Sequence, residues 1–161
     1  MNVMSLMQRN VATVRRGAHL DDAAALLRDR DCGSVVVVDD DRRPVGVVTD
    51  RDVCLAAVQA GLPIGALAVA DVMSERPFTC RGDDTLAAAE QTMSLHQVRR
   101  LPVVDAGGRL VGLLALDDIA AEACREADLL APPVSCAAVG RTLGQITRPH
   151  LVDERGMKVR S

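Results

Sequence analysis

The sequence SVVVVDDDRRPVGVVTDRDV at residues 34–53 returns in pattern as RLPVVDAGGRLVGLLALDDI at residues 100–119. Each stretch holds an aliphatic run, a polar turn, a second aliphatic run and an acidic segment. At this offset of 66 residues, residues 7–53 align with residues 73–119 without a gap. An internal repeat of this kind predicts two structurally similar units.

Identical residues support the repeat. Met7 and Met73, Gly46 and Gly112, and Asp52 and Asp118 are among the pairs that the offset places together. The two units therefore share both the pattern of residue types and several individual side chains.

Within each unit the apolar periodicity changes in the same order. Leu20, Ala23 and Leu27 recur at helical spacing, and two β-branched or aliphatic runs joined by a polar turn then predict a hairpin. Each second strand leads into another helix, and Gly61 is placed to end the first of these helices in a left-handed cap. The expected strands and second helices cover residues 35–38, 45–48 and 50–60 in the first unit, and 101–104, 110–114 and 116–127 in the second.

One unit of about 55 residues buries too little surface to be comfortably stable alone. We therefore expect an α+β fold in which two β-α-β-β-α units pack as one pseudo-symmetric module. The first unit is expected at residues 1–61, a linker at 62–69 and the second unit at 70–130. The C-terminal tail at 131–161 is expected to hold one short helix followed by polar residues.

Composition excludes several classes of function. Among 161 residues there is one aromatic side chain, Phe78, which excludes a stacking platform for single-stranded nucleic acid. A net charge of −3 argues against binding to duplex DNA. No apolar run is long enough to span a membrane and the N-terminus lacks a secretory h-region, so we expect a cytoplasmic protein without membrane contact.

No catalytic or metal-binding motif is found. The chain lacks the P-loop, dinucleotide-binding, nucleophile-elbow and zinc-protease patterns. Its five cysteines are far apart and form no C-x-x-C pair, which predicts reduced cysteines and no zinc site. We expect neither an enzyme nor a required cofactor.

The segment Gly46–Asp52 follows a strand and opens a helix, and it has two interpretations. A glycine, the Thr49 hydroxyl and the Asp52 carboxylate suit a ribose phosphate, because the helix N-terminus and the hydroxyl can donate to phosphate and the carboxylate can accept from ribose. The same two side chains also suit a helix cap, with Thr49 as N-cap and Asp52 in the first turn. The segment alone leaves both interpretations open.

The repeated pattern of a hydrophobic residue, Gly, two hydrophobic residues, Thr or Ser, two variable residues and Asp resembles the cystathionine β-synthase (CBS) domain, which occurs in pairs called Bateman modules. Residues 33–39, 45–52 and 96–105 carry the most specific parts of the resemblance, and Asp71–Ser74 resembles the family's leading segment. The resemblance covers about residues 1–126. The chain looks like the bacterial stand-alone CBS-pair proteins, including those similar to hypoxic response protein.

The resemblance implies two clefts between the units that bind adenosine nucleotides. In the first, Thr49 is expected to contact phosphate or ribose and Asp52 to hold the ribose hydroxyls. Backbone around Thr13, Val14, Ser34 and Val35 is expected to meet the adenine edge.

In the second cleft Asp118 remains as the ribose acceptor, but Ala115 stands where the family has Thr or Ser. This loss of a hydroxyl donor, worth about 1 kcal/mol, predicts a weaker site at Asp118 than at Thr49 and Asp52. Thr79 and its neighbour Phe78 are expected to line this weaker cleft. Arg99 and Arg100 are expected either to face phosphate or to be solvated surface charges.

The resemblance implies a regulatory module that binds AMP, ADP, ATP or a related adenosine ligand without turnover and signals to an unknown protein target. It also implies a homodimer through the helices after Asp52 and Asp118. Small apolar residues on those helices fit such an interface, although they could equally cover their own sheets; they are Val53, Ala56, Ala57, Ala60, Ile119, Ala123 and Ala127. The alternative is a ligand-free pair of CBS domains that serves protein interaction alone.

Overall fold

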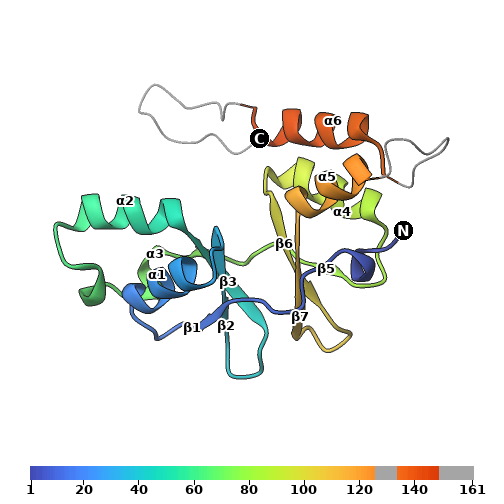
Figure 1. The fold of residues 1–161 in the computed structure, drawn as a ribbon. Coiled ribbons are helices and arrows are strands. Elements are labelled where there is room, and N and C mark those ends of the chain that lie inside the picture. Colours follow the sequence, from blue (N-terminus) through green and yellow to red (C-terminus); the bar gives the residue numbers. More distant parts are fainter. Residues whose placement is uncertain (126–133, 149–161) are drawn as a thin grey trace.

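The computed structural model describes residues 1–125 and 134–148 (Figure 1). The predicted α+β class and the predicted order of elements within each unit are confirmed. Along the chain the elements are η1 Val3–Ser5, β1 Thr13–Arg15, α1 Leu20–Asp29, β2 Ser34–Val38, β3 Pro44–Thr49, α2 Asp50–Ala60, η2 Ile64–Ala66, α3 Val69–Val72, β4 Ser74–Glu75, β5 Cys80–Arg81, α4 Leu86–His96, β6 Arg100–Val104, β7 Leu110–Ala115, α5 Leu116–Arg125 and α6 Cys136–Ile146.

Two small sheets lie side by side, one in each unit (Figure 1). The first has the order β1-β2-β3-β4, with β1 parallel to β2 and the other neighbours antiparallel. The second has the order β5-β6-β7, again with a parallel and then an antiparallel pair. The repeat is thus preserved in strand pairing as well as in sequence.

The segment that leads into each unit packs on the other unit. Met7 lies in the core of the second unit, and Met73 lies in the core of the first. In the same way, β4 pairs with β3, while Gln8 forms a bridge with Leu113 of β7. Each sheet is therefore completed by residues that precede the other repeat, and this exchange ties the two units together.

Two glycines make room for the exchanged segments. A Cβ added at Gly46 would lie 2.5 Å from the Met73 sulfur, and one added at Gly112 would lie 2.6 Å from the Met7 sulfur. A larger residue at either position would have to displace the methionine side chain, and its Cβ would also lie 3.1 Å from a backbone oxygen of the leading segment. The repeated glycine of the sequence motif is thus explained by close packing of the strand against the leader.

The core follows the alternation of side chains along β2. Val35 and Val37 face the core of the first unit, whereas Val36 and Val38 face the other way and pack with Leu110 of the second unit. Alternation of this kind is inherent in a strand. Because both faces of β2 are covered, its continuous run of valines joins the units.

Helix α6 covers α4 and α5 of the second unit (Figure 1). Val134 and Ile146 are buried in the core of that unit. Thr142 is also buried, and its hydroxyl donates a hydrogen bond of 3.2 Å to Oε1 of the buried Glu90 on α4. The short helix expected in the tail therefore belongs to the packed body of the second unit.

Replacing Thr142 with valine is expected to lower the free energy of unfolding by about 1 to 3 kcal/mol, because the Glu90 carboxylate would be left buried without its donor. Urea denaturation monitored by circular dichroism measures the change. The double variant Glu90→Leu with Thr142→Val is expected to recover most of the loss. Equal stability of the single variant and the wild type would contradict this account of how α6 is held.

Within residues 1–125 and 134–148, none of the helices has the length and apolar character needed to cross a membrane.

Candidate functional site

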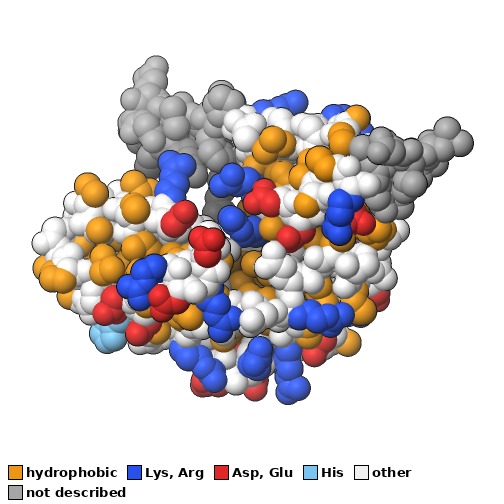
Figure 2. Space-filling model, viewed as in Figure 1, with side chains coloured by type: hydrophobic (Ala, Val, Ile, Leu, Met, Phe, Trp, Pro, Cys, Tyr) orange, Lys and Arg blue, Asp and Glu red, His pale blue; other side chains and the backbone are white. Residues whose placement is uncertain are grey.

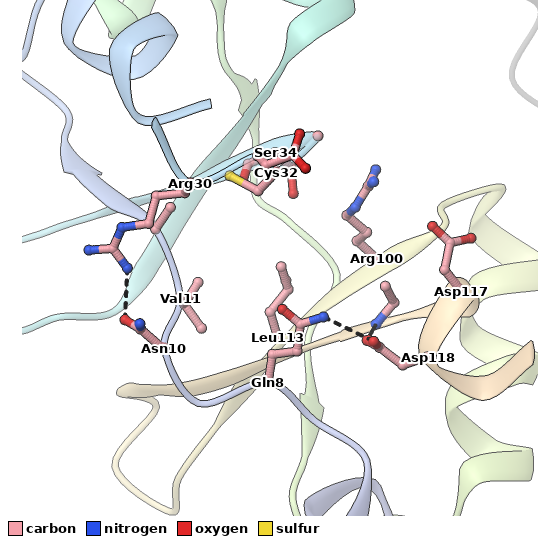
Figure 3. A pocket seen from close by; sticks show the side chains of 14 residues that line it. Gln8, Asn10, Val11, Arg30, Cys32, Ser34, Arg100, Leu113, Asp117 and Asp118 are labelled. Atoms are coloured by element: carbon pink, nitrogen blue, oxygen red, sulfur yellow. Dashed lines mark hydrogen bonds between the residues drawn. The ribbon is translucent and has the colours of Figure 1, made fainter. Parts of the chain in front are cut away.

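A pocket lies between the two units at the start of α5, and we call it the Asp118 pocket (Figure 3). Its volume is about 410 Å³. Lining residues come from the leading segment at 8–12, from the α1–β2 connection at 30–34, from the β7–α5 junction at 113–118, and from Arg100. The space-filling view shows the hollow between the units with basic and acidic side chains around it (Figure 2).

A second pocket, the Thr49 pocket, is the repeat equivalent of the first. Its volume is about 280 Å³. Its lining comes from residues 74–78, from residues 98–100, and from Val47 and Thr49 at the end of β3. Each of these segments stands 66 residues from a segment of the Asp118 pocket, so the exchanged leaders complete both pockets.

The Asp118 carboxylate retains free capacity to accept hydrogen bonds. Its Oδ2 accepts the Ala115 N–H at 3.0 Å, and its Oδ1 accepts from Nε2 of Gln8 at 2.9 Å (Figure 3). An ionised carboxylate has about four acceptor positions, so about two remain. These positions suit the two neighbouring hydroxyls of a ribose.

Two guanidinium groups also line the Asp118 pocket. Nη1 of Arg30 donates to Oδ1 of Asn10 at 2.7 Å, and the Arg100 side chain extends into the pocket from β6 (Figure 3). Neither arginine takes part in any of the six ion pairs among the described residues. A guanidinium without a carboxylate partner is well suited to bind phosphate.

At the Thr49 pocket the two expected ligand-binding side chains are engaged with each other, and only Thr49 lines the pocket. The Thr49 hydroxyl donates to Oδ2 of Asp52 at 2.7 Å, and the Thr49 N–H donates to the same oxygen at 2.8 Å. The hydroxyl oxygen in turn accepts the Asp52 N–H at 3.3 Å. The helix-cap interpretation of these residues is confirmed, whereas their role in ligand binding stays a prediction.

Larger side chains explain the smaller volume of the Thr49 pocket. Where the Asp118 pocket has Ala12 and Asn10, the repeat places Phe78 and Arg76 in the Thr49 pocket. The Phe78 ring stacks on the His96 ring, with centroids 3.5 Å apart.

The structure corrects the predicted grouping of the site residues. Ser34 pairs with Thr49 between β2 and β3 as a neighbour, but it lines the Asp118 pocket and not the Thr49 pocket, and Phe78, which was expected near Asp118, lines the Thr49 pocket. The reason is that each pocket combines segments of both units. Arg99 lines the Thr49 pocket, and Arg100 lines both.

Other predicted residues are placed less directly. Val35 is fully buried and Val14 nearly so, in the core of the first unit, so only their backbone groups could meet a ligand. Thr13 and Thr79 are not among the residues that line either pocket. Asp52 lies in the helix cap and is likewise not among the residues that line the Thr49 pocket.

The sequence interpretation missed Gln8, Asn10 and Arg30. All three line the Asp118 pocket, and two of them belong to the leading segment. Gln8 and Asn10 stand 66 positions before Ser74 and Arg76, which line the Thr49 pocket, whereas His96, the repeat partner of Arg30, lines neither pocket.

The predicted dimer surface must be revised for the second unit. Ile119 and Ala123 of α5 are buried in the core of their own unit, which confirms that this face covers its own sheet. On α2, Val53 and Ala56 are half-buried, and Ala57 and Ala60 are exposed. Ala127 lies outside the described residues.

The described residues contain no group of three or more His, Cys, Asp or Glu side chains that could hold a metal ion. Of the cysteines, Cys80 is buried in the core of the second unit, while Cys54, Cys124 and Cys136 are exposed. Burial, with a smaller contribution from Asp84, raises the pKa of the Cys80 thiol to about 12.

Cys80 is expected to resist alkylation in the folded protein, because its thiolate is disfavoured well above neutral pH. Iodoacetamide at pH 8 followed by peptide mass spectrometry should modify Cys54 and Cys124 but not Cys80. The unfolded thiol has a pKa of about 8.5, so stability should fall as pH rises from about 9 towards 12. Labelling of Cys80 at the rate of Cys54 would contradict the expectation.

The CBS-domain family model matches residues 3–58 and 69–124. The CBS domain-containing protein YhcV of Bacillus subtilis is 36% identical over 119 residues, which cover 74% of this chain and 83% of YhcV. A crystal structure of Hypoxic Response Protein I with two coordinated zinc ions is 29% identical, with a TM-score of 0.68 over 75% of this chain and 98% of that one. The CBS domain protein PAE2072 of Pyrobaculum aerophilum, complexed with AMP, is 27% identical, with a TM-score of 0.70 over 80% of this chain and 98% of that one.

Some relatives are considerably longer. The chain spans 60% of the uncharacterized protein MK0525 of Methanopyrus kandleri and 23% of a homoserine O-acetyltransferase of Methanococcoides burtonii. In the acetyltransferase only the CBS part is matched. The two segments that the family model matches coincide with the two repeat units of the fold. The chain therefore belongs to the CBS-domain family and carries two CBS domains in tandem.

Proposed function

We propose that this protein is a regulatory module that binds an adenosine nucleotide in the Asp118 pocket and does not turn it over. The observation that carries the proposal is the Asp118 carboxylate, which lines a cavity of about 410 Å³ and keeps acceptor positions free for ribose hydroxyls. Arg30 and Arg100 supply donors for a phosphate in the same cavity.

The size and lining of the pocket fit such a ligand. Ala12 and Gly33 present no bulky side chain, which leaves space for a base, and no aromatic ring is among the lining residues. The structure of PAE2072 complexed with AMP supports the class of ligand. We expect the adenine to lie between aliphatic side chains and to be recognised by backbone groups rather than by a stacked ring.

The sequence ranked the Thr49 site above the Asp118 site, and the geometry favours the reverse order. The Thr49 pocket is smaller, and Asp52 does not line it. We therefore propose the Asp118 pocket as the primary site and the Thr49 pocket as a secondary one.

Isothermal titration calorimetry with AMP, ADP, ATP, NAD and S-adenosylmethionine tests the proposal. At least one adenosine ligand is expected to bind with a stoichiometry of one strong site per chain and to remain chemically unchanged after the titration. No binding by any of the five ligands would favour the alternative, a CBS pair that serves protein interaction alone.

We also propose a homodimer in which α2 forms the interface. Leu55 and Val58 on this helix are exposed, and 82% of the Val58 surface is accessible. Orange side chains stand among white ones on this part of the surface in the space-filling view (Figure 2). The proposed interface no longer includes the Ile119 face of α5.

The change Val58→Asp is expected to convert the dimer to a monomer, because each subunit would place a carboxylate in the apolar contact. Sedimentation velocity of the wild type and the variant measures the oligomeric state. Gln59→Asp, on the same exposed helix, serves as a control for added charge. A wild type that sediments as a monomer would contradict the proposed dimer.

A further inference from the structure

Arg100 lines both the Asp118 pocket and the Thr49 pocket. It stands at the repeat position of Ser34, a short side chain that lines the Asp118 pocket but not the Thr49 pocket. The pseudo-symmetry of the two pockets is therefore broken at one pair of positions by a long cation. Arg100 is the first residue of β6, and its side chain lines both cavities.

The Arg100 guanidinium has no fixed partner in the described part of the chain. It takes part in none of the ion pairs there, and no hydrogen bond among these residues involves its side chain. One of its terminal nitrogens, Nη2, lies 2.8 Å from the position that a Cβ on Gly33 would occupy. Because Gly33 lines the Asp118 pocket and has no Cβ, it leaves room for the head group on that side.

The two pockets differ in how much they depend on this cation. The Thr49 pocket also has Arg76 and Arg99, and its one acidic residue, Glu75, is paired with Arg16 at 2.9 Å. The Asp118 pocket has Arg30 as its other cation. Three carboxylates also line the Asp118 pocket, those of Asp31, Asp117 and Asp118. An anion in the Asp118 pocket therefore needs Arg100 to offset this negative charge.

We propose that the two pockets compete for Arg100, so that a phosphate-bearing ligand in the Asp118 pocket weakens anion binding in the Thr49 pocket. One guanidinium fork cannot make the same pair of hydrogen bonds to phosphates in two separate cavities. This inference rests on the proposed function of the Asp118 pocket. The expected coupling is about fivefold or more in affinity and is reciprocal between the two sites.

Site-resolved NMR of the uniformly ¹⁵N-labelled protein tests the competition, with inorganic pyrophosphate as the probe for the Thr49 pocket. The amides of Thr49 and Phe78 report on that pocket, and those of Ser34 and Asp118 report on the other. Pyrophosphate is titrated into the free protein, the AMP-saturated protein and the adenosine-saturated protein. AMP is expected to raise the dissociation constant at the Thr49 and Phe78 amides about fivefold or more, whereas adenosine, which has no phosphate, should leave it unchanged.

Two variants test whether the effect of AMP on pyrophosphate binding arises from the shared Arg100. Arg100→Ser, which copies Ser34, should bind pyrophosphate weakly and to the same extent with and without AMP. Arg99 lines the Thr49 pocket but not the Asp118 pocket, so Arg99→Ser is the matched control. This variant should bind pyrophosphate more weakly but keep the AMP effect. Thermal melts monitored by circular dichroism confirm that both variants fold.

The outcomes distinguish the competition from the proposed function. If AMP shifts the Ser34 and Asp118 amides but leaves pyrophosphate binding unchanged, the competition is wrong and the proposed function stands. An AMP effect that persists in Arg100→Ser, or the absence of any pyrophosphate response at Thr49 and Phe78, also overturns the competition. If AMP and adenosine give no response at Ser34 and Asp118, the titration is repeated with ADP and ATP, and no response to any of the four means that the proposed function fails and the competition with it.

Discussion

Replacing Asp118 with alanine is expected to weaken AMP binding about 100-fold. The variant removes the acceptor for both ribose hydroxyls, and a hydrogen bond to a charged group contributes about 1.5 kcal/mol or more. Two such bonds correspond to about two factors of ten in affinity. Isothermal titration calorimetry of the wild type and the variant measures the change directly.

The equivalent change Asp52→Ala is the matched control. Asp52 and Asp118 each accept a backbone N–H at the start of their helix, so either change should cost about 1 kcal/mol in capping. If the Asp118 pocket is the primary site, Asp52→Ala should change the dissociation constant of AMP at that pocket by about twofold or less. This change is well below the effect of losing a hydrogen bond to a charged group. A large loss in Asp52→Ala and none in Asp118→Ala would instead support the ranking that the sequence predicted.

Replacing Met7 with alanine is expected to lower the free energy of unfolding by about 2 to 5 kcal/mol. The side chain is only 8% exposed and lies in the core of the second unit, packed over Gly112. Its removal leaves a cavity at the point where the leading segment is held to β7. Urea denaturation monitored by circular dichroism gives the change in free energy.

Met4, in the same leading segment, provides the control. It is 49% exposed, so Met4→Ala is expected to change stability by about 0.5 kcal/mol or less. Similar small effects of both changes would mean that the leading segment is not part of the second unit's core. The exchange of leaders between units would then be wrong.

The sequence predicted the elements of each unit well, because the relevant signals are local. The valine run, the helix cap at Thr49 and Asp52, and the left-handed cap at Gly61 each depend on residues close in the chain, and the structure contains all three. Periodicity and capping chemistry act over a few residues and need no knowledge of tertiary contacts.

What the sequence could not predict is which unit each leading segment contacts. A repeat at a fixed offset is satisfied equally if Gly46 packs against Met7 or against Met73, since both methionines occupy the same repeat position. The structure chooses Met73 for Gly46 and Met7 for Gly112. For the same reason the sequence could not predict that Ser34 lines the Asp118 pocket while it pairs with Thr49 in the sheet, because the pockets are built from segments of both units.

The faces of the second helices show a similar limit. Ile119 and Ala123 form an apolar stripe that the sequence assigned either to a partner or to the chain's own sheet. Helical periodicity shows that a face is buried but not what buries it. In the structure, Ile119 and Ala123 are buried in the core of their own unit.

A crystal structure of the protein grown with AMP tests the central claim most directly. We predict electron density for the nucleotide in the Asp118 pocket, with the ribose hydroxyls within hydrogen-bond distance of the Asp118 carboxylate and the phosphate beside Arg100. Density for AMP beside Thr49 and Asp52 with an empty Asp118 pocket would contradict the account.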